Sequence, residues 1–250
     1  MKHDGLPARL FRLIRPPQRI GPFEPYGIAV QDHFAHGRPR RFYIHDLKGT
    51  CIKHSSIEAF SPILRMQLIE ESALSLARGR VLDVGAGTGR HSLLLGAKGL
   101  EVVPVDTERR CVEVMHRRGL STARCADIFD LDDGPFDTIL ALQHTIGLVG
   151  TVERLVQLLA HFRGILAPKG QILVDSTAPI YPASSPFYAG QRELELWYGR
   201  YVGERFLWLY ADFNLLRGCA RLAGLDAELI TQGQNSRDYL ARMANPSDDA

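Results

Sequence analysis

Three glycines at alternate positions constrain this chain more than any other feature of its sequence. Residues 80–91 read RVLDVGAGTGRH, a short apolar run broken by one acid and followed by an apolar helical pattern. The pattern predicts a buried strand that turns sharply into a helix. Glycine suits such a turn because the backbone can adopt conformations closed to residues with a Cβ and because a ligand can approach the main chain closely. We therefore predict that Gly85, Gly87 and Gly89 form a cofactor-binding turn.

The spacing of these glycines separates the turn from the common dinucleotide site. A dinucleotide fingerprint reads G-x-G-x-x-G and places a pyrophosphate at the helix N-terminus. Here the pattern is D-x-G-x-G-x-G, with Asp83 inside the strand. A carboxylate at that position would repel a pyrophosphate and would suit a ligand that carries a cation, such as an amino group or a sulfonium.

At this turn the chain resembles the class I S-adenosylmethionine-dependent methyltransferases, whose first motif is the same combination of an acid and glycines. The resemblance covers roughly residues 80–177. Segments 146–150 and 203–210 are also similar to uncharacterised bacterial methyltransferase-domain proteins. The resemblance to this family implies S-adenosylmethionine as cofactor and S-adenosylhomocysteine as product. It also implies an α/β fold with a doubly wound, mostly parallel seven-stranded sheet that contains one antiparallel member near the C-terminus.

Acids at the ends of the next two strands complete the expected cofactor site. Asp106 ends a predicted strand over residues 101–106, where a carboxylate can accept hydrogen bonds from both ribose hydroxyls. Asp106 also fits the N-cap of the next helix, and the two roles compete for the same oxygens. By resemblance, Asp127 receives the adenine amino group and Ile128 or Phe129 flanks the base. The expected cofactor-binding residues are Asp83, Gly85, Ala86, Gly87, Gly89, Asp106, Thr107, Asp127, Ile128, Phe129 and Gln143.

Strands and helices alternate from residue 61 onward, which is typical of a parallel α/β domain. We predict helices over residues 61–77, 90–98, 107–118, 152–166 and 212–223. The intervening strands are expected over residues 80–84, 101–106, 122–126, 135–142 and 171–175, and short final strands over 224–231 and 238–243. We assign residues 61–250 to the methyltransferase domain, with an insertion over residues 176–211 before its last helix.

The chain before residue 61 has a different character. Residues 9–15 alternate arginines with bulky apolar residues, which indicates a short basic helix that either contacts RNA or a membrane or lies on the domain with solvated arginines. Residues 22–45 are dense in aromatics among Gly and Pro. We assign residues 1–60 to a cap that packs over the cofactor domain, either as a lid for the substrate or as a simple wrap.

The insertion contains two apolar, aromatic runs, residues 193–198 and 205–210, which indicate a hairpin. Its aromatics either close the sheet or wall a pocket for an apolar acceptor. The expected substrate-binding residues are Tyr26, His144, Tyr188 and Trp197.

His144 is the predicted catalytic residue. It follows the fourth strand, where the fold of the resembled family places residues beside the transferring methyl group, and imidazole titrates near neutral pH. It would take a proton from the nucleophile, or else only orient the acceptor. Asp175 and Tyr188 are the next candidates for the base. The related proteins often carry Asn after this strand, whereas this chain has Gln143 and His144, so the identity of the acceptor stays open.

Composition limits the remaining possibilities. The net charge of +2 is too small to indicate a nucleic-acid or membrane partner. The four cysteines lack C-x-x-C spacing, and no HxH or HExxH motif indicates a metal site. With no signal peptide or long apolar span recognised, we expect a cytoplasmic monomer or homodimer.

Three classes of function therefore remain. The first is methyl transfer to an O, N or C nucleophile of a small molecule, as in bacterial specialised metabolism. The second is an RNA or protein methyltransferase that docks through the basic N-terminal segment. The third is a NAD-dependent oxidoreductase or a non-catalytic S-adenosylmethionine-binding protein, and Asp83 argues against a dinucleotide.

Overall fold

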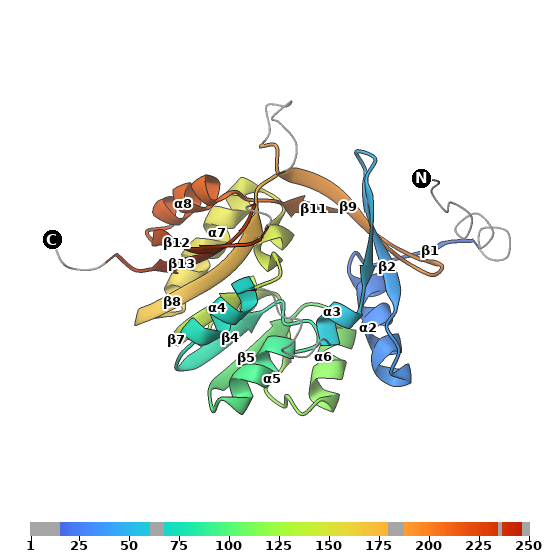
Figure 1. Ribbon diagram of the computed structural model, residues 1–250, viewed down its shortest axis with the longest axis horizontal. Helices are drawn as coiled ribbons and strands as arrows, with labels where there is room; N and C mark the ends of the chain where they lie inside the picture. The colour runs from blue at the N-terminus through green and yellow to red at the C-terminus, as the bar shows by residue number, and fades with distance from the viewer. Residues whose placement is uncertain (1–15, 61–67, 180–187, 235–236, 247–250) are drawn as a thin grey trace.

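A computed structural model describes residues 16–60, 68–179, 188–234 and 237–246. Its larger layer is a seven-stranded sheet in the order β12-β13-β8-β7-β4-β5-β6 (Figure 1). The strands that run parallel in its centre are β4 (Arg80–Val84), β5 (Glu101–Asp106), β6 (Arg124–Cys125), β7 (Phe136–Ala141) and β8 (Leu166–Thr177). Strand β13 (Asp238–Ala244) runs antiparallel between β8 and β12 (Asp226–Gln232). This architecture confirms the predicted doubly wound, mostly parallel sheet.

Helices cover both faces of this sheet because the central strands are apolar on both sides. One face packs against α7 (Val152–Gly164) and α8 (Phe213–Leu222) through a cluster that includes Leu159, Phe162 and Leu216. The other face packs against α4 (Leu68–Leu76) and α5 (Arg90–Ala97) through Ile69 and Leu95. Helix α6 (Arg109–Arg117) follows β5 and contacts β5 and β6. The carboxyl ends of the strands stay uncovered by these helices and face the second layer.

The second layer is a six-stranded sheet built from two distant parts of the chain. The N-terminal part supplies β1 (Gln18–Ile20), β2 (Arg41–Asp46) and β3 (Cys51–Ser55), and the insertion supplies β9 (Gln191–Tyr198), β10 (Tyr201–Gly203) and β11 (Phe206–Leu209). Strand β2 pairs antiparallel with β9, and β11 pairs with the first half of β9. The predicted hairpin is present, but the sequence did not indicate that it would share a sheet with the N-terminal segment.

A helix that the sequence analysis did not predict supports this second sheet. Helix α2 (Glu24–His36) starts with Pro25 in its first turn and ends at Gly37, whose φ of 63° lies in the left-handed region. Its residues Ala29 and Val30 are fully buried against β2, β9 and α6. The density of aromatics, Gly and Pro concealed a helix whose ends follow the usual positions of Pro and Gly.

Two other predictions concern segments that precede β4 in the chain. The predicted helix over residues 61–77 corresponds to α4 from Leu68 onward, with a short separate helix α3 (Ile57–Phe60) before it. Residues 61–67 lie outside the described part of the chain, as does the basic segment 9–15.

Candidate active site

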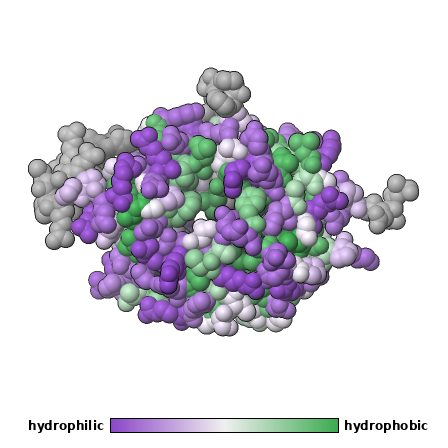
Figure 2. Space-filling model, turned by 180° about the vertical axis from the view of Figure 1, so that it is seen from behind, coloured by the Kyte–Doolittle hydropathy of each residue, from purple (hydrophilic) through white to green (hydrophobic). Residues whose placement is uncertain are grey.

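The two sheets enclose a cavity of about 800 Å³ at the carboxyl ends of β4, β5 and β7. In Figure 1 strand β9 arches from the edge of the larger sheet towards β2, so that the second sheet stands opposite those strand ends. Figure 2 shows apolar surface bordering a hollow near the middle of the opposite face of the molecule. A volume of this size lies near the upper end of the range for ligand pockets.

The glycine turn lies on one wall of this cavity, and its glycines have different roles. Gly85, Gly87 and Gly89 all have positive φ, between 57° and 75°. A Cβ at Gly89 would collide with the end of the Leu120 side chain, and the left-handed φ of 75° also favours glycine there. A Cβ at Gly87 would meet only the Tyr26 hydroxyl, at 3.2 Å, and would otherwise point into open space. The main chain at Gly87 is therefore open to a bound ligand.

Asp106 holds this turn in place from the end of β5. Its Oδ2 accepts a hydrogen bond from the Gly87 amide at 2.8 Å, and its Oδ1 accepts one from the Glu108 amide at 2.8 Å. The N-cap of α6 is Glu108, not Asp106. A carboxylate has about four acceptor positions, so Asp106 can still accept from ligand hydroxyls. Burial raises the pKa of Asp106 to about 6, and the two amides oppose that rise.

Asp127, Ile128 and Phe129 line the cavity next to Asp106. Asp127 is exposed and accepts a hydrogen bond from the Phe129 amide at 3.0 Å, which caps the short 3₁₀ helix η2 (Ile128–Asp130). The guanidinium of Arg154 lies 4.9 Å from the centre of the Phe129 ring. The apolar side chains of Ile128 and Phe129 therefore lie beside the exposed carboxylate of Asp127, a combination that fits a purine with an exocyclic amino group.

Asp83 is buried beneath the turn and accepts a hydrogen bond from the Ser92 hydroxyl at 2.5 Å. Burial raises its pKa above the usual range. The predicted cofactor residues Ala86, Thr107 and Gln143 also line the cavity. Except for Gly89, the structure therefore brings all of the predicted cofactor-binding residues to one cavity wall.

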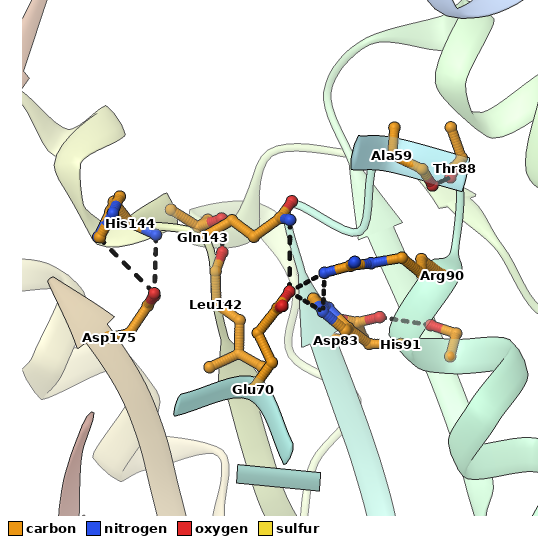
Figure 3. A network of polar contacts seen from close by, with 12 residues as sticks. Ala59, Glu70, Asp83, Thr88, Arg90, His91, Leu142, Gln143, His144 and Asp175 are labelled. Carbon is orange, nitrogen blue, oxygen red and sulfur yellow. Dashed lines mark hydrogen bonds and ion pairs between the residues drawn. The ribbon is translucent and has the colours of Figure 1, made fainter. Parts of the chain in front are cut away.

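A buried charged cluster that sequence reasoning missed lies beside the turn (Figure 3). Glu70 of α4 pairs with Arg90, and its Oε1 lies 3.0 Å from His91 Nε2. Burial lowers the pKa of His91, which favours the neutral imidazole. Gln143 Nε2 donates to the same Glu70 oxygen at 3.4 Å. The sequence analysis did not single out Glu70, because its burial depends on Arg90 and His91 of a different helix.

Gln143 and His144 both adopt left-handed backbone conformations, with φ of 58° and 59°. Consecutive non-glycine residues in this region are strained and tend to occur at functional sites. The His144 amide donates to Asp175 Oδ1 at 2.8 Å, and His144 Nδ1 lies 3.7 Å from Asp175 Oδ2. Burial raises the pKa of Asp175, and His144 opposes that rise. The loop is thus held by Glu70 on one side and by Asp175 on the other (Figure 3).

The second sheet forms the opposite wall, and alternation decides which of its residues face the cavity. Leu194 and Leu196 of β9 line the cavity. Trp197 points to the other face of the sheet, where its ring lies tilted against that of His45 with the centres 4.4 Å apart. Trp208 of β11 lines the cavity instead.

Of the four predicted substrate-binding residues, two reach the cavity. Tyr26 and His144 line it, and burial raises the pKa of Tyr26 well above its usual value. Tyr188 donates its hydroxyl hydrogen to Asp212 at 2.6 Å and, like Trp197, is not among the described residues that line the cavity.

Across the described ranges, no group of three or more His, Cys, Asp or Glu side chains could hold a metal ion. Nor does any helix within these ranges combine the length and apolar character that a bilayer crossing requires.

Comparison with known proteins agrees with this geometry. Residues 81–170 match a methyltransferase domain family. A crystal structure of an S-adenosylmethionine-dependent methyltransferase from Bacteroides fragilis, in complex with S-adenosylhomocysteine, is 33% identical. It superimposes with a TM-score of 0.82 over 90% of this chain and 96% of its own. The chain therefore belongs to the S-adenosylmethionine-dependent methyltransferases, as the glycine turn predicted.

More distant relatives share smaller parts. The cypemycin N-terminal methyltransferase of a Streptomyces species is 33% identical over 103 residues, which are 40% of this chain and 42% of that protein. The matches to curated relatives thus span about half of those proteins or less. The sugar N-methyltransferase KedS8 from a Streptoalloteichus species has a TM-score of 0.57 at 14% identity over 81% of this chain and 97% of its own, which is a likeness of fold alone.

Proposed function

We propose that this protein transfers the methyl group of S-adenosylmethionine to an oxygen or nitrogen nucleophile of a small molecule, with His144 as the general base. The observation that carries this proposal is the strained loop at the end of β7, on which His144 lines the cavity. The cofactor supplies an electrophilic methyl group on a sulfonium. The chain must align the nucleophile with that group and remove a proton from it.

Residues of the glycine turn and its neighbours hold the cofactor. The open main chain at Gly87 and the Asp83 carboxylate beneath the turn suit the charged amino acid end. Asp106 accepts from the ribose hydroxyls while it keeps the amides of Gly87 and Glu108. Asp127 accepts from the adenine amino group, and Ile128 and Phe129 contact the ring.

Asp175 gives His144 the geometry that a base needs. Its bond to the His144 main chain fixes the strained backbone, and its second oxygen lies on the Nδ1 side of the ring. A carboxylate there favours a proton on Nδ1 and leaves Nε2 free to accept one from the acceptor. The imidazolium that forms is then stabilised by the nearby negative charge. Asp175 is therefore a positioning residue in this proposal, and Tyr188 has no part in it.

The enclosed site favours a small acceptor over a macromolecule. The second sheet stands over the strand ends, so a nucleophile must enter a cavity that has a wall on either side. A protein or RNA acceptor would have to insert its target group between the two sheets. The alternative of docking through the basic segment 9–15 concerns residues outside the described part of the chain.

Labelled methyl transfer tests the proposal. The purified protein is incubated with S-adenosylmethionine labelled on its methyl carbon and with a cell extract divided by ultrafiltration into small molecules, protein and RNA. We expect label in the small-molecule fraction, with His144→Gln abolishing most of it. Label confined to the protein or RNA fraction would contradict a small-molecule acceptor. Equal labelling by His144→Gln would contradict the assignment of the base.

A further inference from the structure

The cavity face of the second sheet is apolar, and this face indicates what kind of acceptor it receives. Six side chains from four strands alternate towards the cavity: Ile44, Ile52, Leu194, Leu196, Phe206 and Trp208. Strand register places them in contact across the sheet. Ile44 lies opposite both Ile52 and Leu196, and Leu194 lies opposite Phe206. Together these six residues form what we call the acceptor wall.

The outward face of the same strands is polar by comparison. Between the wall residues, His45 and Lys53 alternate outward on β2 and β3, and Glu193 and Glu195 do so on β9, where Glu195 is buried and pairs with Arg19. Sheet strands with one face on water and one on a core show such alternation. Part of this apolar face packs against α2 through Ile44, Leu196 and Phe206, and the same face also lines the cavity, where an apolar group can contact it.

The charges on the cavity side of these strands neutralise each other. Arg192 Nε donates to Asp46 Oδ2 at 2.6 Å, and Asp46 Oδ1 accepts from the Lys48 amide at 2.9 Å. His54 of β3 also lines the cavity, and burial lowers its pKa, which favours its neutral form, while the nearby Glu58 opposes that shift. A charged acceptor would therefore lose its hydration against this wall and gain no unpaired counter-ion there.

Two aromatic rings, set nearly at right angles to each other, form part of the wall. The Phe206 and Trp208 rings lie with their centres 6.4 Å apart at an interplanar angle of 72°, and Trp208 also packs against Gly147, next to the loop that carries His144. A flat ring of the acceptor that lies on the aliphatic side chains of the wall and meets the edges of Phe206 and Trp208 can bring its substituent to the loop that carries His144. Such aromatic contacts add to the effect of apolar area alone.

We propose that the acceptor is a neutral, mainly apolar molecule with a flat ring that lies against the acceptor wall, and that Ile44 and Ile52 help to select it. Its hydroxyl or amine group points to Gln143 and His144. This inference rests on the proposed function, because it assumes that the remaining part of the cavity holds the cofactor. It names the acceptor class that the wall chemistry recognises.

Binding of two simple probes to the protein saturated with S-adenosylhomocysteine tests the inference. The probes are 2-naphthol, a neutral flat ring with one hydroxyl, and D-glucosamine, a polar amine of comparable size. We expect 2-naphthol to bind, as measured by its fluorescence, and D-glucosamine to bind at least tenfold more weakly in calorimetry. Tighter binding of D-glucosamine, or no binding of 2-naphthol up to its solubility, would overturn the inference.

Adjacent residues on opposite faces of β2 provide a matched pair of variants. Ile44→Thr keeps a β-branched side chain but exchanges a cavity-facing apolar group for a hydroxyl. Tyr43→Thr makes the same kind of change on the outer face, where Tyr43 is 39% exposed. We expect Ile44→Thr to weaken 2-naphthol binding roughly tenfold, which is the size of effect that one lost apolar group has in a binding pocket. Tyr43→Thr should stay within twofold of the wild type.

Affinity for S-adenosylhomocysteine distinguishes a failure of the proposed function from a failure of the acceptor wall. Wild-type protein that fails to bind S-adenosylhomocysteine would contradict the proposed function. Wild-type protein that binds it while Ile44→Thr and Tyr43→Thr affect 2-naphthol equally would contradict only the acceptor wall. If Ile44→Thr lowers the melting temperature, the pair Ile52→Thr and Lys53→Thr on β3 repeats the comparison, since Ile52 is 48% exposed at the edge of the cavity.

Discussion

Asp106 should make the affinity for cofactor fall as the pH drops below 6. Burial raises the pKa of this carboxyl to about 6, and its ionised form is the one that accepts hydrogen bonds from the ribose. Below that pKa the protonated carboxyl is a poorer acceptor. The affinity for S-adenosylhomocysteine should therefore be constant above about pH 7 and decrease as the pH falls through the pKa.

The size of the effect follows from the pKa. At pH 5, roughly a tenth of the free protein carries the ionised carboxylate, so the dissociation constant should rise about tenfold between pH 7 and pH 5. Binding at pH 6 should release about half a proton, because binding favours the ionised form. Calorimetry in two buffers of different ionisation enthalpy measures both quantities.

An Asp106→Asn variant assigns the dependence to this residue. Loss of a charge-assisted acceptor costs about 1.5–3 kcal/mol, so the variant should bind tenfold to a hundredfold more weakly at pH 8. Its amide also leaves one of the two N–H groups, of Gly87 or Glu108, without an acceptor, and its melting temperature should fall. Its remaining affinity should vary little between pH 5 and 8. A wild-type affinity that is flat over this range would refute the reasoning.

Three further predictions concern the loop and the turn. His144→Gln should lower kcat by about a hundredfold or more in steady-state kinetics, with S-adenosylhomocysteine affinity within a few-fold in calorimetry. Asp175→Asn can still accept from the His144 amide but cannot stabilise the imidazolium, so steady-state kinetics should show a lower kcat with little change in KM. Gly87→Ala forces a Cβ into a left-handed residue, which costs about 1–2 kcal/mol, and towards the ligand, so titration should detect almost no cofactor binding. Gly96→Ala, inside α5 with nothing within 4 Å, should instead raise the melting temperature and keep full binding, and weakened binding there would contradict the distinction.

The local part of this structure could be predicted from the sequence. The positions of Asp83, Asp106 and Asp127 follow from the strands of a parallel sheet, because Asp83 lies within β4, Asp106 ends β5 and Asp127 follows β6. Topology then brings them to one edge without further information. His144 was predicted to lie at the same edge for the same reason, because it follows β7.

The parts that could not be predicted depend on contacts between distant segments. The pairing of β2 with β9 has no local signal, because each strand needs the other to complete its sheet. Glu70 is buried by Arg90 and His91, which no helical pattern around residue 70 reveals. Trp197 shows a third kind of difficulty, since a strand of known position still has two faces, and only the register with β2 and β11 determines which face meets the cavity.

The shared second sheet also has a consequence for how the protein forms during synthesis. Asp46 and its partner Arg192 are 146 positions apart in the chain. All five parallel strands of the larger sheet lie between them, so β1, β2 and β3 leave the ribosome long before β9 exists. Contacts of such long range are slow to form because a large loop must close first. We expect the cofactor-binding part of the nascent chain to fold before the acceptor-binding part. The pairing of β2 with β9 should then be the last major step in the formation of the second sheet.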